Sequence, residues 1–180
     1  MRFVSLLRGI NVSGQKKIKM ADLKALYQSL GFKNVVTYIQ SGNVIFNSPS
    51  EDLVSLIDII EKEIEDKYEF HVPVILRTEQ EFQWISNSCP YKEAEIEENG
   101  TKILVTFLAS TPSLEKQELL ETHVALPEKL TIKGNEVYLY CPNGYGRSKI
   151  SNTVIENKLG VTATTRNWKS ITKLSALSCE

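Results

Sequence analysis

The chain has 180 residues, of which 42% are hydrophobic and 24% are charged, as in ordinary globular domains. These values exclude a disordered or fibrous chain and leave room for one domain or two small ones. The 21 basic and 22 acidic side chains give a formal net charge of −1, which excludes a general electrostatic attraction to nucleic acid or to an anionic membrane.

The cysteines and the N-terminal residues indicate a cytoplasmic protein. Cys89, Cys141 and Cys179 cannot all pair with one another and show no CxxC spacing, so we expect reduced thiols. Arg8 interrupts the first apolar run, unlike in a signal peptide. No apolar stretch approaches the roughly 18 residues of a membrane-spanning helix, and we expect no association with a membrane.

The first 77 residues predict the order strand, helix, strand, strand, helix, strand. The first helix carries Leu23, Leu26 and Tyr27 on one face and ends at Gly31. The second helix is expected to open at Pro49-Ser50. The predicted strands are short apolar runs and cover residues 3–7, 35–39, 44–46 and 71–76.

Residues 78–100 are expected to connect two units. Thr78 and Glu81 have the spacing of a capping box, which predicts the start of a connecting helix. The acidic run 93–98 is typical of a solvated linker.

Residues 101–180 predict the same order again, followed by a C-terminal helix. Thr111 is expected to cap the first helix of this unit, with Pro112 at its first position. Gly134-Asn135 suits a two-residue hairpin loop, Gly160 ends the second helix, and Asn167 caps the terminal helix. The predicted strands cover residues 103–108, 129–132, 137–140 and 161–165.

The repeated order predicts an α+β protein built from two tandem ferredoxin-like units, also called alpha-beta plaits, with the order βαββαβ. Each unit would contain an antiparallel sheet. The expected domains are residues 1–77 and 101–180, with the connecting helix and acidic linker between them.

Polar residues of the first unit should gather at one sheet edge. In the ferredoxin-like plan the end of the first strand lies beside the turn between the second and third strands. Arg8 and Asn11 follow the first strand, and Gln40, Ser41 and Asn43 belong to that turn. We expect these five side chains to line one side of a ligand site.

The second unit carries its polar residues after its third and fourth strands. These residues are Arg147, Ser148, Lys149, Arg166 and Asn167. The ends of the two strands share one edge of the sheet, and the cluster would form the other side of the site if the units bring the two edges together.

The chemistry of both clusters favours recognition of an anionic or amide-bearing small molecule, such as a nucleotide. Arginine offers a planar set of donors to phosphate or carboxylate, and asparagine and glutamine match donors and acceptors together. The structural alternative is that these side chains cap helices and satisfy turns.

Sharper motifs fail on spacing or on partners. Gly9 and Gly14 are spaced as in a phosphate-binding P-loop, but Gln15 stands where that motif has lysine. His71 and His123 are too isolated to predict a metal site, and we expect no metal and no cofactor.

Three sequence segments, LLRGINV at residues 6–12, TYIQSGNV at 37–44 and ATTRNW at 163–168, with RSK at 147–149, resemble the bacterial domain-of-unknown-function 1697 family. The resemblance covers essentially the whole chain. It implies two alpha-beta plait units in one small cytosolic bacterial protein, and it implies no activity. Ser13 stands where the family pattern has a second glycine.

We therefore expect a ligand-binding protein, and two other classes of function stay open. An enzyme would need a base or nucleophile, for which Ser41, Tyr145 and Lys149 are the candidates, while Cys141 has no visible partner base.

An interaction module, for protein or RNA, would use an exposed sheet of the second unit. Tyr138 and Tyr140 share one face of a strand there, and a homodimer that buries them is one form of this alternative. The absence of an RNP1 pattern argues against RNA.

Overall fold

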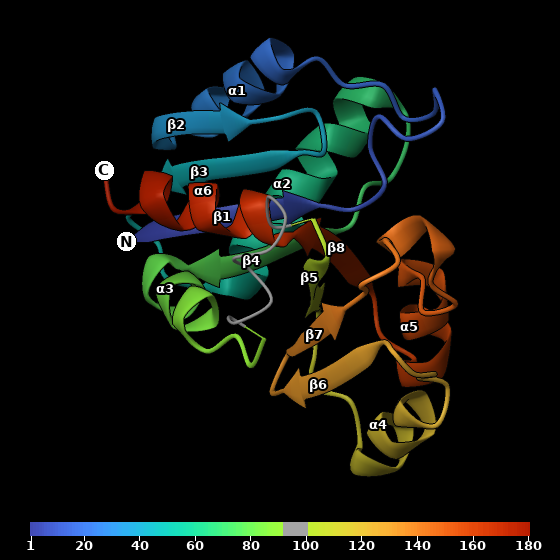
Figure 1. The fold of residues 1–180 in the computed structure, drawn as a ribbon. Coiled ribbons are helices and arrows are strands. Elements are labelled where there is room, and N and C mark those ends of the chain that lie inside the picture. The colour runs from blue at the N-terminus through green and yellow to red at the C-terminus, as the bar shows by residue number, and fades with distance from the viewer. Residues whose placement is uncertain (92–100) are drawn as a thin grey trace. The chain divides into compact units, whose positions relative to one another are not determined.

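The structure is a computed structural model that describes residues 1–91 and 101–180 (Figure 1). These residues form two four-stranded antiparallel sheets and six α-helices, which confirms the α+β class. They group into two compact units, residues 1–84 with 174–180 and residues 85–173. The expected domain division at 77 and 101 stays a prediction, and the acidic run 93–98 lies outside the described residues.

The first unit has the strand order β2-β3-β1-β4. Helices α1 and α2 pack on one face of this sheet, where Tyr27 and Ile60 meet Phe3, Leu7 and Phe46 in one buried core. The elements are β1 (Arg2–Leu7), α1 (Met20–Ser29), β2 (Lys33–Tyr38), β3 (Asn43–Asn47), α2 (Leu53–Tyr68) and β4 (Val74–Thr78). Helix α3 (Glu79–Asn87) begins in the first unit, and its residues from 85 onward belong to the second.

Local capping explains where the helices of this unit begin and end. Gly31, with φ of 84°, follows α1 in the left-handed conformation that glycine adopts without strain. The expected opening of α2 at Pro49-Ser50 is wrong, because the Asp52 carboxylate caps the helix by accepting from Val54 N at 3.1 Å and Ser55 N at 3.3 Å.

The capping box before α3 is confirmed. Thr78 N donates to Glu81 Oε2 at 2.7 Å, and Glu81 N donates to Thr78 Oγ1 at 3.2 Å. The two residues therefore satisfy each other's backbone donors at the start of the connecting helix.

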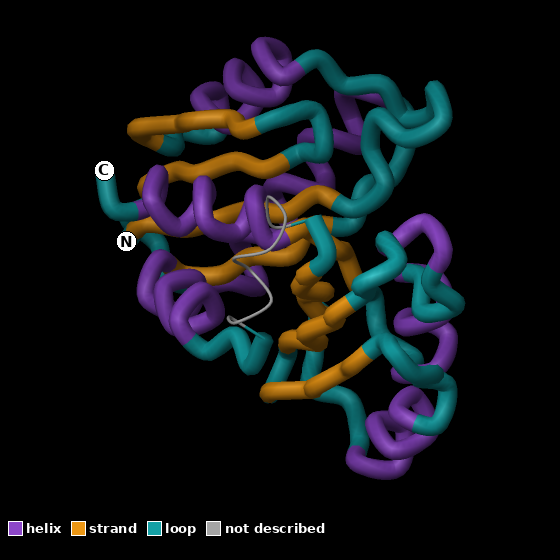
Figure 2. Tube along the Cα trace, in the orientation of Figure 1, coloured by secondary structure: helices purple, strands orange, loops and turns teal. Residues whose placement is uncertain are grey.

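The second unit has the corresponding strand order β6-β7-β5-β8. Helices α4 and α5 place Leu120, Ile155 and Leu159 against Leu104 and Leu139 of the sheet. The strands and helices of the chain are distinguished by colour in Figure 2. The elements are β5 (Ile103–Leu108), α4 (Leu114–Glu121), β6 (Lys129–Lys133), β7 (Glu136–Tyr140), a 3-10 turn (Tyr145–Arg147), α5 (Asn152–Leu159) and β8 (Ala163–Asn167). Helix α6 (Trp168–Ser178) begins in the second unit, and its residues from 174 onward belong to the first.

The predicted hairpin and the predicted helix end are found in the second unit, whereas the predicted helix start is not. Lys133 pairs with Glu136 across Gly134-Asn135, and Gly160, with φ of 67°, ends α5. The N-cap residue of α4 is Ser113, not Thr111, whose hydroxyl donates to the Asn135 side chain instead.

One backbone bond recurs in both units. Leu7 N donates to Gly42 O at 2.8 Å, and Leu108 N donates to Asn135 O at 2.8 Å. In each case the residue that ends the first strand holds the turn between the second and third strands. The two units can therefore be compared connection by connection.

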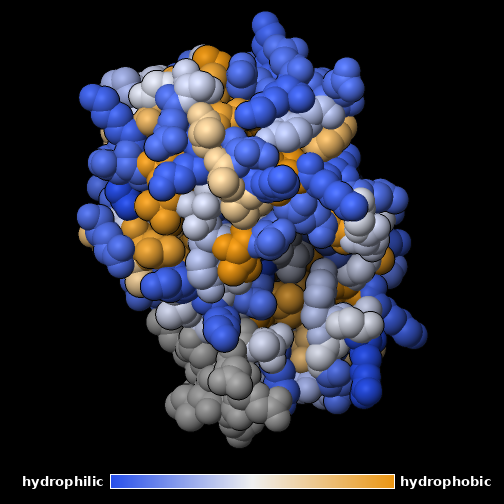
Figure 3. All heavy atoms as spheres, turned by 90° about the horizontal axis from the view of Figure 1, so that it is seen from above, coloured by the Kyte–Doolittle hydropathy of each residue, from blue (hydrophilic) through white to orange (hydrophobic). Residues whose placement is uncertain are grey.

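Two further features concern the surface and the termini. In the view of Figure 3, hydrophilic residues make up most of the visible surface and hydrophobic residues form smaller patches among them.

None of the helices within residues 1–91 and 101–180 has the length and apolar character that a membrane span requires. The C-terminal residues belong to the first unit, where Arg2 Nη2 donates to Leu177 O at 2.9 Å.

Candidate functional site

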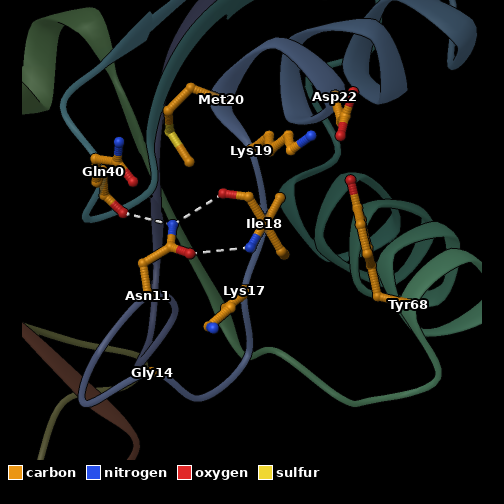
Figure 4. A pocket seen from close by; sticks show the side chains of 9 residues that line it. All are labelled: Asn11, Gly14, Lys17, Ile18, Lys19, Met20, Asp22, Gln40 and Tyr68. Atoms are coloured by element: carbon orange, nitrogen blue, oxygen red, sulfur yellow. Dashed lines mark hydrogen bonds between the residues drawn. The ribbon is translucent and has the colours of Figure 1, made fainter.

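A cavity of about 540 Å³ opens in the first unit. Its walls come from the connection between β1 and α1, the first turn of α1, the turn between β2 and β3, and the end of α2 (Figure 4). The lining residues are Asn11, Gly14, Lys17, Ile18, Lys19, Met20, Asp22, Gln40 and Tyr68. The volume lies in the range of small-molecule sites.

The Asn11 side chain joins two walls of this cavity (Figure 4). Its Nδ2 donates to Ile18 O and to Gln40 O, both at 2.9 Å, and its Oδ1 accepts from Ile18 N at 2.9 Å. Asn11 has φ of 56°, a left-handed conformation that asparagine tolerates better than most residues. The amide that we expected to bind a ligand is therefore engaged in positioning the cavity walls.

The connection between β1 and α1 is restrained at further points. Gln15 N donates to Val12 O at 2.9 Å, and Lys16 Nζ donates to His71 O at 2.6 Å. Ser13 and Lys16 also have positive φ, 50° and 44°. Conformations of this kind are costly for residues other than glycine and persist where the surroundings hold them.

The charged groups of the cavity are two lysines and one carboxylate. Lys17, Lys19 and Asp22 contribute a formal charge of +1 in sum. The first turn of α1 adds the positive end of the helix dipole. The Lys19 side chain at the N-cap position makes no capping bond to the backbone amides of this turn. Burial is the main cause that raises the pKa of Tyr68, and the nearby Asp22 carboxylate adds to it. The Tyr68 hydroxyl therefore stays protonated and can donate a hydrogen bond.

The structure brings the two predicted segments of the first unit together, as the topology argument required. Leu6 pairs with Asn43 between β1 and β3, and the Asn11 side chain reaches Gln40. Only Asn11 and Gln40 of the five predicted residues line the cavity.

The other three predicted residues of the first unit are placed elsewhere. Arg8 N donates to Pro73 O at 2.9 Å. Asn43 is fully buried, and its Nδ2 donates to Tyr38 O at 2.9 Å and to Ser41 Oγ at 3.0 Å. Arg8, Ser41 and Asn43 do not line the cavity.

A second, smaller cavity of about 270 Å³ lies in the second unit. Arg147 and Lys149 line it. Ser148 does not line the cavity. Its Oγ donates to Glu128 Oε2 at 3.0 Å and accepts from Ile150 N at 2.9 Å. Two of the five predicted residues of the second unit are therefore at a cavity.

Arg166 and Asn167 do not line this cavity. Both belong to β8 and not to the loop after it, where we expected them. Arg166 is buried, and its Nη1 donates to Thr164 Oγ1 at 2.7 Å and to Thr165 O at 2.9 Å. Burial lowers its pKa to about 10. The Asn167 side chain accepts from Ser170 N at 2.9 Å, as a helix cap. A site shared by the clusters of both units stays a prediction.

Burial acts against activation of two of the candidate nucleophiles, Cys141 and Tyr145. Burial raises the pKa of the Cys141 thiol to about 11, opposite to the shift that activates a thiol. Burial also raises the pKa of Tyr145, and Ser41 Oγ accepts from Asn43. Within residues 1–91 and 101–180, no group of three or more metal-ligating side chains is found.

The aromatic face predicted for the second unit is not exposed at Tyr138. This side chain is fully buried, and its hydroxyl donates to Ile85 O in α3 at 3.0 Å. Tyr140 is partly buried and lies 6.2 Å from Tyr91 between ring centroids. Tyr138 is therefore not available to the interaction module that we kept as an alternative, and the homodimer stays a prediction.

Known proteins identify the family and the fold. Residues 1–138 match the family described as "Protein of unknown function (DUF1697)", and the chain belongs to this family. The fold is similar to that of the conserved bacterial protein SP0830 from Streptococcus pneumoniae, with 24% identity, coverage of 98% of each chain and a TM-score of 0.75. No curated protein matches the chain.

Sequence reasoning missed most of the charged lining. Lys17 and Lys19 follow Gly14 in a basic stretch, a signal that the failed P-loop spacing led us to set aside. Tyr68 gives no local signal, because the end of α2 brings it to the cavity from a distant part of the chain.

Proposed function

We propose that the first unit binds a small anionic molecule in the cavity formed by residues 11–19, the first turn of α1, Gln40 and Tyr68. Both units would follow the ferredoxin-like plan, and the cavity would be an addition to that plan in one of them. The ligand site that we expected from the sequence is thereby limited to the first unit. Lys17 and Lys19, rather than Arg8, would provide its positive charges.

The observation that carries the proposal is a difference in length between corresponding connections. In the first unit 12 residues, 8–19, connect the first strand to the first helix. In the second unit five residues, 109–113, make the corresponding connection. The shorter connection is sufficient for the strand order, so the longer one serves another purpose. Long ordered loops of this kind are often binding loops.

The chemistry of the lining supports an anion. Lys17 and Lys19 provide ammonium donors for a phosphate or carboxylate, and the amides of the first turn of α1 add further donors. Gln40 can donate and accept, and Ile18 and Met20 offer apolar contact to the rest of a ligand.

The restraints on the loop support a site that exists before the ligand arrives. Asn11 fixes Ile18 and Gln40 relative to each other, and Lys16 fixes the loop to residue 71. A preformed site loses less conformational entropy on binding. The strained backbone of the loop is then the cost of holding the lysines in place.

A thermal-shift screen tests the proposal. Inorganic phosphate, nucleoside monophosphates, sugar phosphates and short carboxylates are added to the full chain and to Lys17→Ala with Lys19→Ala. We expect at least one phosphorylated compound to raise the midpoint of the original chain, because a ligand that binds only the folded state stabilises it. The double variant should lose that shift.

The matched control is Lys24→Ala with Lys33→Ala, which removes the same charge from exposed positions outside the cavity. It should keep the full shift. Equal loss in both double variants would mean that net charge, not the cavity, determines binding, and the proposal would be wrong.

A further inference from the structure

The second unit has lengthened connections of its own, at places where the first unit is short. Residues 122–128 connect α4 to β6, and residues 141–151 connect β7 to α5. The corresponding connections of the first unit are residues 30–32 and 48–52. Both long connections line the cavity of about 270 Å³. Two additions that the strand order does not require therefore meet at one cavity.

One direct bond joins the two connections, and each connection has a further bond of its own. Ser148 Oγ donates to Glu128 Oε2 at 3.0 Å, and Ile150 N donates to Ser148 Oγ at 2.9 Å. Glu128 N donates to Ala125 O at 3.0 Å. The Ser148–Glu128 bond thus joins the two walls of the cavity.

The cavity combines cations with an apolar wall. Arg147 and Lys149 line it, and the one carboxylate of the lining, Glu128, is engaged by Ser148. Leu126 is 92% exposed, an unfavourable position for a large apolar side chain unless a partner covers it.

The histidine of the lining has a defined orientation. His123 Nδ1 lies 2.8 Å from Leu119 O, and because a carbonyl only accepts, Nδ1 must carry the proton in this bond.

We propose that this cavity is a second binding site, independent of the first, for a small organic anion that carries a compact apolar group. The anion is a phosphate monoester or a carboxylate bound by Arg147 and Lys149, and the apolar group packs on Leu126 and Pro127. The volume admits a ligand smaller than a nucleotide.

A titration followed by ¹H–¹⁵N NMR on the full chain tests the site with phenyl phosphate, benzoate and inorganic phosphate as probes. We expect saturable shifts of amides in residues 122–128 and 141–151 with phenyl phosphate or benzoate. Inorganic phosphate should bind several-fold more weakly than phenyl phosphate, because it lacks the group that covers Leu126. Arg147→Ala with Lys149→Ala should weaken binding about tenfold or more.

Three controls separate this site from general charge effects and from the first cavity. Lys116→Ala with Lys173→Ala removes an equal charge from exposed positions and should leave the affinity unchanged. Leu126→Ser should abolish the advantage of phenyl phosphate over inorganic phosphate. Lys17→Ala with Lys19→Ala should leave these shifts intact, even if the first cavity binds nothing.

Several outcomes would overturn the inference. They are an absence of saturable shifts in the two connections, equal weakening by the charge-matched control, and equal binding of phenyl phosphate and inorganic phosphate. If Arg147→Ala with Lys149→Ala disturbs the spectrum elsewhere, Lys149→Gln alone replaces it, and unchanged affinity in that variant also counts against the site.

Discussion

The Asn11 side-chain amide donates to Gln40 O at 2.9 Å across 29 positions of sequence. Through its other bonds to Ile18, the same carboxamide ties the entry to α1 to the turn between β2 and β3. One side chain thereby fixes two walls of the cavity in the first unit.

Asn11→Asp should destabilise the chain by about 1–3 kcal/mol, because it replaces two donated bonds with a carboxylate facing two carbonyl oxygens. Urea unfolding measures the change. Asn11→Gly is the matched variant, since it removes the bonds but relieves the left-handed conformation, and it should be less damaging. Equal stability of Asn11→Asp and the original chain would show that the two donated bonds contribute little.

Gly42→Ala should cost about 2–5 kcal/mol of folding free energy. A Cβ at Gly42 would lie 2.6 Å from Ile10 Cδ1 and 2.8 Å from Leu7 Cβ, and φ is 76°. Gly134 in the corresponding turn has φ of 60° with nothing within 4 Å of its Cβ position, so Gly134→Ala should cost only about 1–2 kcal/mol. Thermal or urea unfolding measures the stability loss of each variant. A larger loss for Gly134→Ala than for Gly42→Ala would contradict the close packing at Gly42.

The capping box before α3 should contribute measurably to stability. Thr78→Ala removes the acceptor for Glu81 N and should cost about 1 kcal/mol, whereas Thr78→Ser keeps the hydroxyl and should cost less. A double-mutant cycle with Glu81→Ala should show coupling between the two positions, because each bonds to the other. Additive losses would mean that the two side chains act separately.

The three thiols should differ widely in reactivity. Cys179 is exposed, whereas Cys89 and Cys141 are buried. With a pKa of about 11, Cys141 is a thiolate in only about one molecule in a thousand at pH 8. Iodoacetamide followed by mass spectrometry should modify Cys179 first and Cys141 only after urea is added. Comparable rates for Cys141 and Cys179 in the native chain would contradict its burial.

The sequence was informative where a local signal determines the structure. Gly134-Asn135 allows the two-residue hairpin whatever surrounds it, and Thr78 with Glu81 forms its capping box from adjacent backbone. At the start of α4, Thr111 and Ser113 are both able to cap. The helix begins after Ser113, whose side chain makes no capping bond, and Thr111 donates to Asn135 instead, a contact that no local pattern contains.

The candidate site was only partly predictable for the same reason. The proximity of Asn11 and Gln40 could be predicted, because paired strands fix which loops are neighbours. The burial of Asn43 at the start of β3 and the place of Arg166 inside β8 could not be predicted from these loops. Tyr68 reaches the cavity through the length and packing of α2, so its role requires the three-dimensional structure.

The central claim, that the first-unit cavity takes a small anion, is tested most directly by a crystal structure of the chain with the tightest-binding compound of the thermal-shift screen. We expect the anionic group of this compound to lie within hydrogen-bond distance of Lys17 Nζ or Lys19 Nζ, with another part of the molecule beside Gln40. A compound bound elsewhere, with only water in the cavity of the first unit, would contradict it.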